Sequence, residues 1–522
     1  MCSVDGFTGS APFSIEEYAE FNKDRGPDGT SYYKDDQIQI AHSLLSIQPN
    51  STEQPIVSER TGNVLSYNGE IYDVFRNDAK YLFDILESKD LDILRYDTNG
   101  MWAFAYYNRS QQRLYLGRDH FGVKPLFYVS LNNQLYFSST MKPLFAVLNE
   151  LGYGVEKDDV QEDRWQMSSR FMAGSYTPFK YIRKVCPGEI KVWDMKLGRF
   201  LRSDTMWGPK WNLKPNYKWT PEELKQIAYE SISRVCQSDK KTTLSLSGGL
   251  DSSLIAGIGH EVLDSVTSTQ FIRTKNKETD NEPMFGEYQI AKRTAEHWDI
   301  PIETNQYRYG YKPDQLYFSQ WDMNRIAPRY TNIKTAAENG CKVYLVGDGA
   351  DEMITGYNGD HGIEFDSMSR YVRDGTYPDD KKHQDINMMV NTDLFREDLV
   401  NNFLFERTMR HGDGFNMTTD YLCGLHGIES RAPFFYQKFA KYLLTIPSGF
   451  KWHTPNKDIN FGTYKWVFRE CLSEYYTDEV KDRVKKTGFA APWDSRQEKL
   501  NRQMANEEFN QLLIDANELS FN

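Results

Sequence analysis

The sequence predicts two domains of different fold class: an α+β domain with two stacked β-sheets and covering helices, followed by an α/β domain with a parallel sheet. Length is the first observation, because 522 residues exceed what one hydrophobic core usually serves. The second observation is a change of pattern along the chain. Short alternating or apolar runs dominate the first half, whereas strand and helix patterns alternate in the second half.

Composition excludes several classes of protein. The hydrophobic content of 39% is typical of a globular chain, and the net charge of −12 argues against a nucleic-acid-binding surface. No apolar run reaches the roughly 18 residues of a membrane span, and residues 1–5 do not resemble a signal peptide. Six cysteines lie far apart without metal-type spacing. We therefore expect a cytoplasmic protein with reduced thiols, no nucleic-acid partner and no membrane association.

Apolar periodicity predicts the elements of the first half. Alternating or continuous apolar runs bounded by turn residues favour strands, and amphipathic stretches favour helices that cover the sheets. Strands are expected at residues 64–67, 101–107, 113–117 and 134–138, and helices at residues 15–22 and 79–87.

Cys2 is the candidate nucleophile of this half. Removal of Met1 leaves a thiol and a free α-amine on one residue. The amine has an ordinary pKa of about 7.7–8.0, which suits a base that takes the proton of a thiol with a pKa of about 8.5. Nucleophile and base then belong to one residue, the terminal-nucleophile form of covalent catalysis. An ordinary buried cysteine is the alternative.

Three further segments favour the catalytic interpretation. Residues 25–29 form a turn-rich loop of the kind that fixes an arginine, here Arg25, against a terminal strand. Asn68 and Gly69 follow a predicted strand, so that an amide side chain and a backbone N–H converge on one oxygen, as an oxyanion hole requires. Asp78 follows shortly after them and is suited to bind a cationic amine.

A passage punctuated by Gly and Pro, residues 186–218, separates the two halves. Helical periodicity begins directly after it, with Thr220 as the expected N-cap and Pro221 as the first helical residue. The predicted domains therefore span residues 1–205 and 218–522, joined by a linker.

The second half is organised around the hexapeptide Ser-Gly-Gly-Leu-Asp-Ser at residues 247–252. It follows an apolar strand at 243–246 and leads into an amphipathic helix at 252–260. This arrangement holds phosphates on backbone N–H groups at a helix N-terminus, with Asp251 placed to hold Mg²⁺ against them. The lysine of the kinase-type P-loop is absent. The alternative is a Ser/Gly turn that merely caps a helix.

A second acidic loop ends another predicted strand. After a strand at 265–272 and a helix at 284–296, the strand at 343–346 ends in Gly-Asp-Gly-Ala-Asp-Glu, residues 347–352. Ligands of parallel sheets bind at the carboxyl ends of strands, which is where both acidic loops fall. An acidic helix cap is the alternative, but a cap needs one acid and this loop has three.

Taken in order, these motifs resemble the glutamine-hydrolysing asparagine synthetase family. They are Cys2, Arg-Gly-Pro-Asp at 25–28, Asn-Gly-Glu at 68–70, Gly-Arg-Asp at 117–119 and the hexapeptide at 247–252. The resemblance implies an N-terminal nucleophile hydrolase with an αββα sandwich, which acts as a glutaminase. It also implies a doubly wound, adenine-nucleotide α-hydrolase-like synthetase domain and an ammonia tunnel between the two.

The resemblance assigns roles in the first half. Cys2 attacks the side-chain carbonyl of glutamine, and Asn68 and Gly69 stabilise the resulting oxyanion. The glutamine-binding residues are Arg25, Glu70 and Asp78, with Asp78 at the α-amine.

One departure from the family pattern concerns glutamine binding. Leu44 occupies the place of the arginine that clamps the glutamine α-carboxylate in the family. Losing such a charge-assisted contact costs about 1.5–3 kcal/mol. Either another cation substitutes, or the glutaminase is weak, or the amide donor is not free glutamine.

In the second half the resemblance implies ATP as a substrate and Mg²⁺ as its metal, held by Asp251 and Asp351. Lys486 neutralises the phosphorus during adenylate formation. Asp348 replaces a glutamate thought to orient the acceptor or take a proton from ammonia, and Tyr436 replaces an aspartate. The ATP and pyrophosphate contacts are Leu246, Ser247, Gly248, Gly249, Asp251, Ser252, Ile272, Val346 and Gly347.

The leading hypothesis is a glutamine-dependent asparagine synthetase. It converts aspartate, ATP and glutamine to asparagine, AMP, pyrophosphate and glutamate through a β-aspartyl-adenylate. One alternative is a related amidotransferase that amidates a peptide, a nucleotide or another metabolite. The other is a catalytically silent binding relative. The expected partners are small molecules, and a homodimer is compatible with the sequence.

Overall fold

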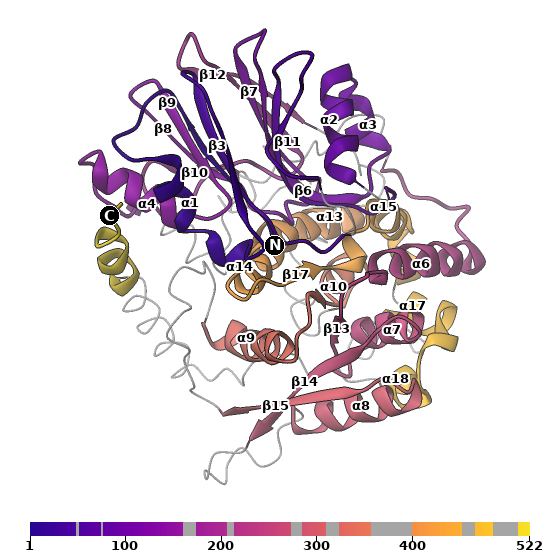
Figure 1. Ribbon diagram of the computed structural model, residues 1–522. Helices are drawn as coiled ribbons and strands as arrows, with labels where there is room; N and C mark the ends of the chain where they lie inside the picture. Colours follow the sequence, from indigo (N-terminus) through magenta and orange to yellow (C-terminus); the bar gives the residue numbers. More distant parts are fainter. Residues whose placement is uncertain are drawn as a thin grey trace.

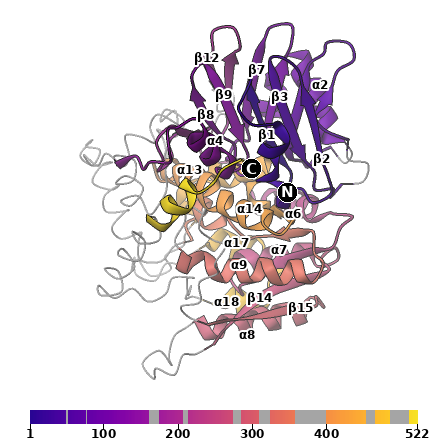
Figure 2. The same ribbon diagram turned by 60° about the vertical axis from the view of Figure 1, so that its left-hand side comes forward.

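The computed structural model describes residues 1–48, 52–74, 77–159, 174–205, 213–272, 284–308, 323–356, 399–451, 465–483 and 510–521. A sandwich of two β-sheets forms one half of the molecule, and a sheet with helices on both faces forms the other (Figure 1). The two halves are in contact, and the same division is evident in the rotated view of Figure 2.

The first half contains two six-stranded antiparallel sheets. The first has the order β10-β8-β9-β1-β3-β2 and the second the order β12-β11-β7-β6-β5-β4. The strands are β1 (Ser3–Thr8), β2 (Thr30–Lys34), β3 (Ile38–Ser43), β4 (Ile56–Val57), β5 (Val64–Ile71), β6 (Gly100–Asn108), β7 (Arg113–Arg118), β8 (Phe127–Leu131), β9 (Gln134–Ser138), β10 (Ile182–Lys184), β11 (Glu189–Asp194) and β12 (Arg199–Thr205).

Apolar side chains from both sheets form the layer between them. Val4 and Ile40 belong to the first sheet, and Ala103 and Leu116 to the second, and all four are fully buried in one cluster. Helices cover the outer faces: α1 (Ile15–Glu20) contacts β1 and β3, α4 (Lys142–Glu150) contacts β9, and α2 (Asp78–Ser88) contacts β5. The predicted αββα sandwich is confirmed. The short elements α3 (Leu91–Tyr96) and η1 (Lys23–Arg25) complete this half.

The second half contains a five-stranded parallel sheet of order β15-β14-β13-β16-β17. Strand order reverses between β13 and β16, so this is the switch point where open α/β sheets bind ligands. Figure 1 shows α6 and α7 on one side of the sheet and α9 on the other, which confirms the doubly wound class. The strands are β13 (Thr242–Ser245), β14 (Ser265–Ile272), β15 (Ile302–Arg308), β16 (Val343–Leu345) and β17 (Glu429–Arg431).

The helices of this half begin where the sequence indicates. Thr220 caps α6, because its hydroxyl accepts from the Glu223 backbone N–H at 3.1 Å, and Pro221 is the first helical residue. The helices are α6 (Pro221–Cys236), α7 (Leu250–Gly259), α8 (Met284–His297), α9 (Met323–Glu338), α10 (Ala350–Met353), α13 (Leu399–His411), the π-helix η5 (Gly412–Asn416), α14 (Met417–Gly424), η6 (Pro433–Phe435), α15 (Gln437–Thr445), α16 (Ser448–Lys451), α17 (Trp466–Cys471), η8 (Ser473–Tyr475) and α18 (Asp478–Asp482).

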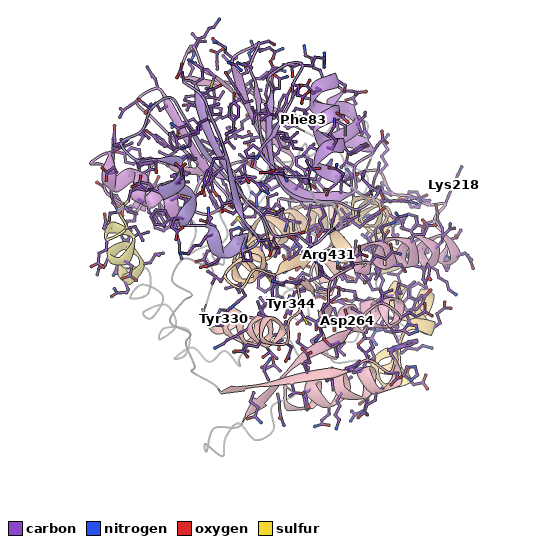
Figure 3. The ribbon with its side chains drawn as sticks, in the orientation of Figure 1. Phe83, Lys218, Asp264, Tyr330, Tyr344 and Arg431 are labelled. Carbon is purple, nitrogen blue, oxygen red and sulfur yellow. The ribbon has the colours of Figure 1, made fainter. Side chains whose placement is uncertain are left out.

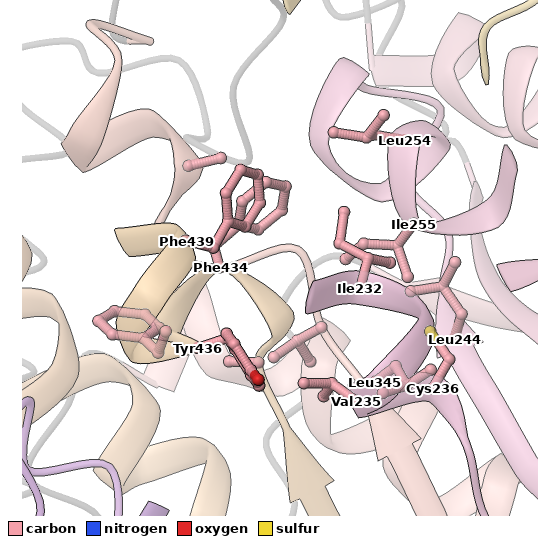
Figure 4. Packing of buried hydrophobic residues seen from close by; sticks show 14 of the residues in the cluster. Ile232, Val235, Cys236, Leu244, Leu254, Ile255, Leu345, Phe434, Tyr436 and Phe439 are labelled. Atoms are coloured by element: carbon pink, nitrogen blue, oxygen red, sulfur yellow. The ribbon is translucent and has the colours of Figure 1, made fainter. Parts of the chain in front are cut away.

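One apolar core holds the sheet to its helices. Ile232 and Cys236 of α6 pack with Leu244 of β13, Leu345 of β16 and Ile255 of α7 (Figure 4). All five side chains are fully buried. Because burial of one such side chain stabilises the fold by about 1.5–3 kcal/mol, this cluster fixes the strand ends that carry both acidic loops.

Buried ion pairs join the two halves. First-half side chains contact charged residues of η5, α14 and β17, and Arg431 of β17 lies at the junction in Figure 3. A buried charge is tolerated only when it is paired and hydrogen-bonded, so these contacts fix how the halves dock. The pairs are Arg25–Asp420 (2.7 Å), Lys124–Asp420 (3.2 Å), Lys124–Glu429, Arg118–Asp413 (2.6 Å), Lys184–Asp413 (2.5 Å) and Glu70–Arg431 (2.9 Å).

The last described segment of the chain returns to the first half. Residues 510–517 are helical, and Asn517 exchanges hydrogen bonds with the backbone of Val155 at 2.8 and 3.0 Å. Phe521 stacks on Phe13 with ring centroids 3.9 Å apart. The division into 1–205 and 218–522 stays a prediction, and this segment belongs by packing to the first unit.

All six cysteines are free thiols, and three of them are fully buried. Among the described helices, none combines the length and apolarity that a membrane crossing requires.

Candidate functional site

Cys2 directly precedes β1 and is held by two backbone contacts. The Leu45 backbone N–H lies 3.4 Å from the Cys2 thiol sulfur, and Arg25 donates through Nε to the Cys2 carbonyl at 3.2 Å. The predicted anchoring of Arg25 against the terminal strand is therefore present. Burial raises the pKa of the Cys2 thiol. A thiol in this environment needs a base before it can act as a nucleophile.

Asn68 and Gly69 lie on β5, which faces β1 across the sandwich and contacts it. The Asn68 side chain is fully buried, and neither its amide nitrogen nor its oxygen has a hydrogen-bond partner in the described part of the chain. Gly69 has φ of 154°, and a Cβ there would lie 2.2 Å from the Met101 carbonyl oxygen. An unpaired buried amide beside an obligatory glycine fits an oxyanion hole.

Asp78 begins α2 beside the same strand. Its carboxylate accepts from the Tyr67 hydroxyl at 2.9 Å, from the Ile71 N–H at 3.0 Å and from the Ala79 N–H at 2.9 Å. Burial raises the pKa of Asp78 to about 6, and these hydrogen bonds oppose the rise. The carboxylate is thus oriented next to the Asn68–Gly69 segment, where a cationic group of a ligand would stabilise its charged form.

Glu70 is engaged with the second half of the molecule. Arg431 donates to both of its carboxylate oxygens, through Nε at 3.0 Å and Nη2 at 2.9 Å. Burial raises the pKa of Glu70 to about 7, although the charge of Arg431 lowers it. The glutamine contact that the resemblance predicts for Glu70 would therefore be shared with a guanidinium.

Leu44 is fixed by its backbone next to the thiol. Its N–H donates to the Gly29 carbonyl at 2.8 Å, its carbonyl accepts from the Asp28 N–H at 3.0 Å, and Leu45 follows at the Cys2 sulfur. The structure therefore places Leu44, at the position where the family resemblance expects a cation, one residue before the backbone contact to the thiol.

The hexapeptide at 247–252 forms the turn from β13 into α7. Gly248 has φ of 76°, and a Cβ there would lie 2.7 Å from the Glu287 carbonyl oxygen, so the position requires glycine. Ser252 bridges the turn, because its hydroxyl lies 3.1 Å from the Ser247 hydroxyl and accepts from the Ser247 N–H at 3.2 Å. The N-cap residue Gly249 offers no capping side chain. The start of α7 therefore has no side-chain cap, and the two serines bridge the turn instead.

Asp251 and Asp351 meet at one cation. The ammonium of Lys465 is ion-paired with both carboxylates, and it is 4% exposed whereas each carboxylate is 16% exposed. Burial alone lowers the pKa of Lys465, but the two carboxylates raise it above its ordinary value. Gly356 allows this close packing, since a Cβ there would overlap Asp351.

This donor set fits Mg²⁺ with a polyphosphate. Mg²⁺ is usually bound by one or two carboxylates, with phosphate oxygens and waters completing its octahedron. The described residues contain two such acids here and no group of three or more metal-ligating side chains. Asp251 and Asp351 would hold the ion, as the sequence predicts.

The ends of β13 and β16 bring together further residues that the sequence predicts to contact ATP. Leu246 and Val346 are buried, and a Cβ on Gly347 would lie 3.0 Å from the Ser252 backbone nitrogen. Ile272 is the last residue of β14. Lys486 lies outside the described residues, so its role stays a prediction.

Two family models match the chain. The model described as asparagine synthase matches residues 223–520, and the model described as glutamine amidotransferase domain matches residues 41–146. The first alone covers more than half of the chain. The chain belongs to the asparagine synthase family. The resemblance that the sequence motifs carry is thereby confirmed.

Individual relatives are distant. Asparagine synthetase [glutamine-hydrolyzing] 1 of Bacillus subtilis is 28% identical over 69% of this chain and 59% of its own length. Asparagine synthetase B [glutamine-hydrolyzing] of Escherichia coli is 26% identical over 68% of this chain and 65% of its own length. Amidase chry2 of Gibberella zeae is 22% identical over 88% of this chain and 82% of its own length. The match thus spans about three fifths of the length of the two synthetases.

Within this asparagine synthase family member, Asp348 has a partner that the sequence did not reveal. Arg329 of α9 donates to both oxygens of Asp348 at 2.6 and 2.9 Å and to the Thr419 hydroxyl at 2.5 Å. Its guanidinium lies 4.1 Å from the centre of the Phe415 ring. His411 pairs with Glu352 at 2.8 Å and lies 4.0 Å from Asp348.

Other functional candidates were also missed. Lys465 directly precedes α17 and was not assigned to the site from the sequence. Arg431 was missed because no spacing rule links it to Glu70, which is 361 residues away. Tyr436 is buried and hydrogen-bonds Asp73 of the first half, so it contributes to the interface between halves.

Proposed function

We propose that the chain is an AMP-forming amide ligase with two sites, a glutaminase in residues 1–205 and an ATP-dependent synthetase in residues 218–522. The proposal depends mainly on one observation. Asp251 and Asp351 both pair with Lys465 at the switch point of the parallel sheet, beside the turn at 247–252 that is suited to bind phosphates. Cys2, next to β1 and facing the strand with Asn68, supplies the second site.

In the glutaminase, the Cys2 sulfur attacks the side-chain carbonyl carbon of glutamine. The α-amine exposed by Met1 removal takes the thiol proton and later gives it to the leaving nitrogen, so ammonia departs and a thioester remains. Asn68 Nδ2 and the Gly69 N–H donate to the oxyanion, and water then releases glutamate. Asp78 binds the α-amine of glutamine, and Arg25 fixes the Cys2 backbone.

In the synthetase, an acceptor carboxylate oxygen attacks the α-phosphorus of ATP, and pyrophosphate leaves. Ammonia then attacks the acyl carbon, AMP leaves, and an amide forms. Mg²⁺ held by Asp251 and Asp351 would neutralise charge on the phosphates. The N–H groups at the start of α7 and the Lys465 ammonium add positive charge at the same place.

Aspartate is the default acceptor, which gives asparagine as the product. A different carboxylate is the second candidate, and the Asp348–Arg329 pair favours it. Arg329 occupies both oxygens of Asp348, so an Arg–Asp pair lies where the family resemblance expects a single glutamate. A cytoplasmic location and a homodimer remain predictions.

The test is mass spectrometry of products formed from ATP, Mg²⁺ and either glutamine or ammonium with a panel of carboxylic acids. AMP, pyrophosphate and one amide are expected. Cys2→Ala should abolish the glutamine-driven reaction and leave the ammonium-driven reaction intact. Formation of ADP, or equal loss of both reactions in Cys2→Ala, contradicts the proposal.

A further inference from the structure

His411 is the last residue of α13, where the chain passes into the π-helix η5. This turn packs closely against the first half of the molecule, because a Cβ on Gly412 would lie 2.2 Å from the Phe121 carbonyl oxygen. Turns of the π-helical type are rare and often mark functional sites. Here the turn holds the ring of His411 against the acidic loop at 347–352.

The two ring nitrogens of His411 differ in their surroundings. Nδ1 lies 2.8 Å from the Glu352 carboxylate, whose side chain is 3% exposed. Because a carboxylate accepts hydrogen bonds, Nδ1 is assigned the proton, and Nε2 of the neutral ring keeps its lone pair. Nε2 is buried, and no hydrogen-bond partner for it lies in the described part of the chain. Phe415 and Phe435 flank the ring at centroid distances of 5.0 and 6.3 Å, so the lone pair has a fixed direction.

The other charged side chains at this place are engaged with each other. Both oxygens of Asp348 accept from Arg329, at 2.6 and 2.9 Å, and Arg329 also donates to the Thr419 hydroxyl. Nε2 of His411 lies 4.0 Å from Asp348, which is beyond hydrogen-bond distance. His411 is therefore the group here, among the residues that the structure describes, with a nitrogen lone pair that no protein donor uses.

The charges that face His411 suit it to proton transfer near neutral pH. They belong to Glu352 of α10, Asp348 of the acidic loop and Arg329 of α9. Burial alone lowers the pKa of His411, but the two carboxylates raise it above its ordinary value of 6.5 against the opposing charge of Arg329. A base is most effective when its pKa lies close to the working pH.

The His411–Glu352 pair lies next to the expected phosphate site. Glu352 directly follows Asp351, which pairs with Lys465 at the place suited to Mg²⁺. In an acyl-adenylate a single oxygen atom separates the acyl carbon from the α-phosphorus, so amide formation takes place beside the phosphates. The pair is thus on the same edge of the parallel sheet as the bond that ammonia must break.

We propose that His411 is the catalytic residue that takes the proton from the attacking nitrogen during amide formation, with Glu352 as its positioning residue. This inference rests on the proposed amide-ligase function. The nitrogen of ammonia forms a bond to the acyl carbon, the bond from that carbon to the phosphate oxygen breaks, and AMP leaves with the electron pair. Nε2 of His411 takes one proton from the positively charged nitrogen and releases it to solvent, which leaves a neutral amide.

The experiment compares two partial reactions of the full chain, with aspartate or the acid that the product panel identifies. ATP–pyrophosphate exchange stops at the adenylate, and amide formation from ammonium includes the proton transfer. His411→Gln should leave the exchange near the wild-type rate and lower kcat/KM for ammonia by about 10²–10⁴-fold. His426→Gln is the matched control, because Nε2 of His426 is also buried without a hydrogen-bond partner in the described residues. No carboxylate of those residues forms an ion pair with His426, so both reactions should stay near the wild-type rate in this variant.

The pH profile separates a base from a residue that only supports the fold. Rates are referred to the concentration of neutral ammonia, so that the ionisation of ammonium does not contribute. In the unmodified protein kcat/KM for ammonia should fall as the pH drops through the pKa of His411, because a protonated Nε2 cannot accept a proton. This fall should vanish in His411→Gln. It should move to lower pH in Glu352→Gln, because Glu352 raises that pKa.

The outcomes separate the inference from the proposed function. Absence of exchange and of amide in the unmodified protein defeats the ligase function itself. If both reactions occur, the role of His411 is refuted when His411→Gln keeps its kcat/KM for ammonia, when it loses the exchange to the same extent, or when His426→Gln shows the same loss. If His411→Gln does not fold, the pH profile of Glu352→Gln decides, and an unshifted profile refutes the role. Loss confined to amide formation, with the shifted profile, supports it.

Discussion

Asp420 offers a direct test of how the two halves are held together. It is fully buried in α14 and lies 2.7 Å from Arg25 and 3.2 Å from Lys124. Asp420→Asn keeps the shape of the side chain but leaves two buried cations without this carboxylate. Removing one partner of a buried pair typically costs about 3–5 kcal/mol. We expect a loss in the free energy of unfolding of that order, measured by urea titration with tryptophan fluorescence.

The pH dependence of this loss has a definite sign. Burial alone raises the pKa of Asp420, but Arg25 and Lys124 lower it below its ordinary value. The stabilisation by Asp420 is therefore full above the unfolded pKa of about 3.9 and is lost as the pH falls through the lower folded pKa. The difference between wild type and Asp420→Asn should be constant near neutral pH and shrink below about pH 4.

The control is a surface carboxylate. Asp84→Asn breaks an exposed i,i+4 pair with Lys80 and should cost no more than about 0.5 kcal/mol. If Asp420→Asn destabilises the protein no more than Asp84→Asn does, the buried pairs do not hold the halves together and the reasoning is wrong.

Three further predictions follow from single sites. Leu44→Arg introduces the cation that the family pattern has at this position and should lower the KM for glutamine about ten- to a hundredfold in a glutamate-release assay. An unchanged KM means that another cation already binds the glutamine α-carboxylate. Asp251→Asn removes half of the expected metal site and should block pyrophosphate release with either nitrogen source, so an unchanged yield refutes the metal assignment. Gly69→Ala places a Cβ 2.2 Å from the Met101 carbonyl and should abolish glutaminase activity and lower the thermal midpoint, whereas near-normal activity argues against Gly69 in the oxyanion hole.

The local sequence pattern predicted the helices and strands well, but it did not predict which charged side chains form pairs. The strand at Ser265–Ile272, the Thr220 cap and the start of α8 at Met284 lie where apolar periodicity and capping residues indicated. Each of these depends on neighbours within a few residues. By contrast, Glu70 and Arg431 are 361 residues apart, and Asp251 and Lys465 are 214 apart. A charged residue carries no sequence signal that distinguishes a solvated position from a buried pair formed only by the tertiary fold.

The departures from the family pattern fall into two groups, according to what each residue contacts. Tyr436 hydrogen-bonds Asp73 across the interface, which gives that substitution a structural reason. Leu44 instead directly precedes the residue that contacts the Cys2 thiol, and Asp348 lies in the acidic loop at 347–352, where glutamine and the acceptor would bind. The hexapeptide at 247–252, suited to hold the phosphates of ATP, matches the family motif. We therefore expect this chain to differ from its relatives in the acceptor that it amidates. Arg329, which donates to both oxygens of Asp348, is the side chain to examine first as the cause of that difference.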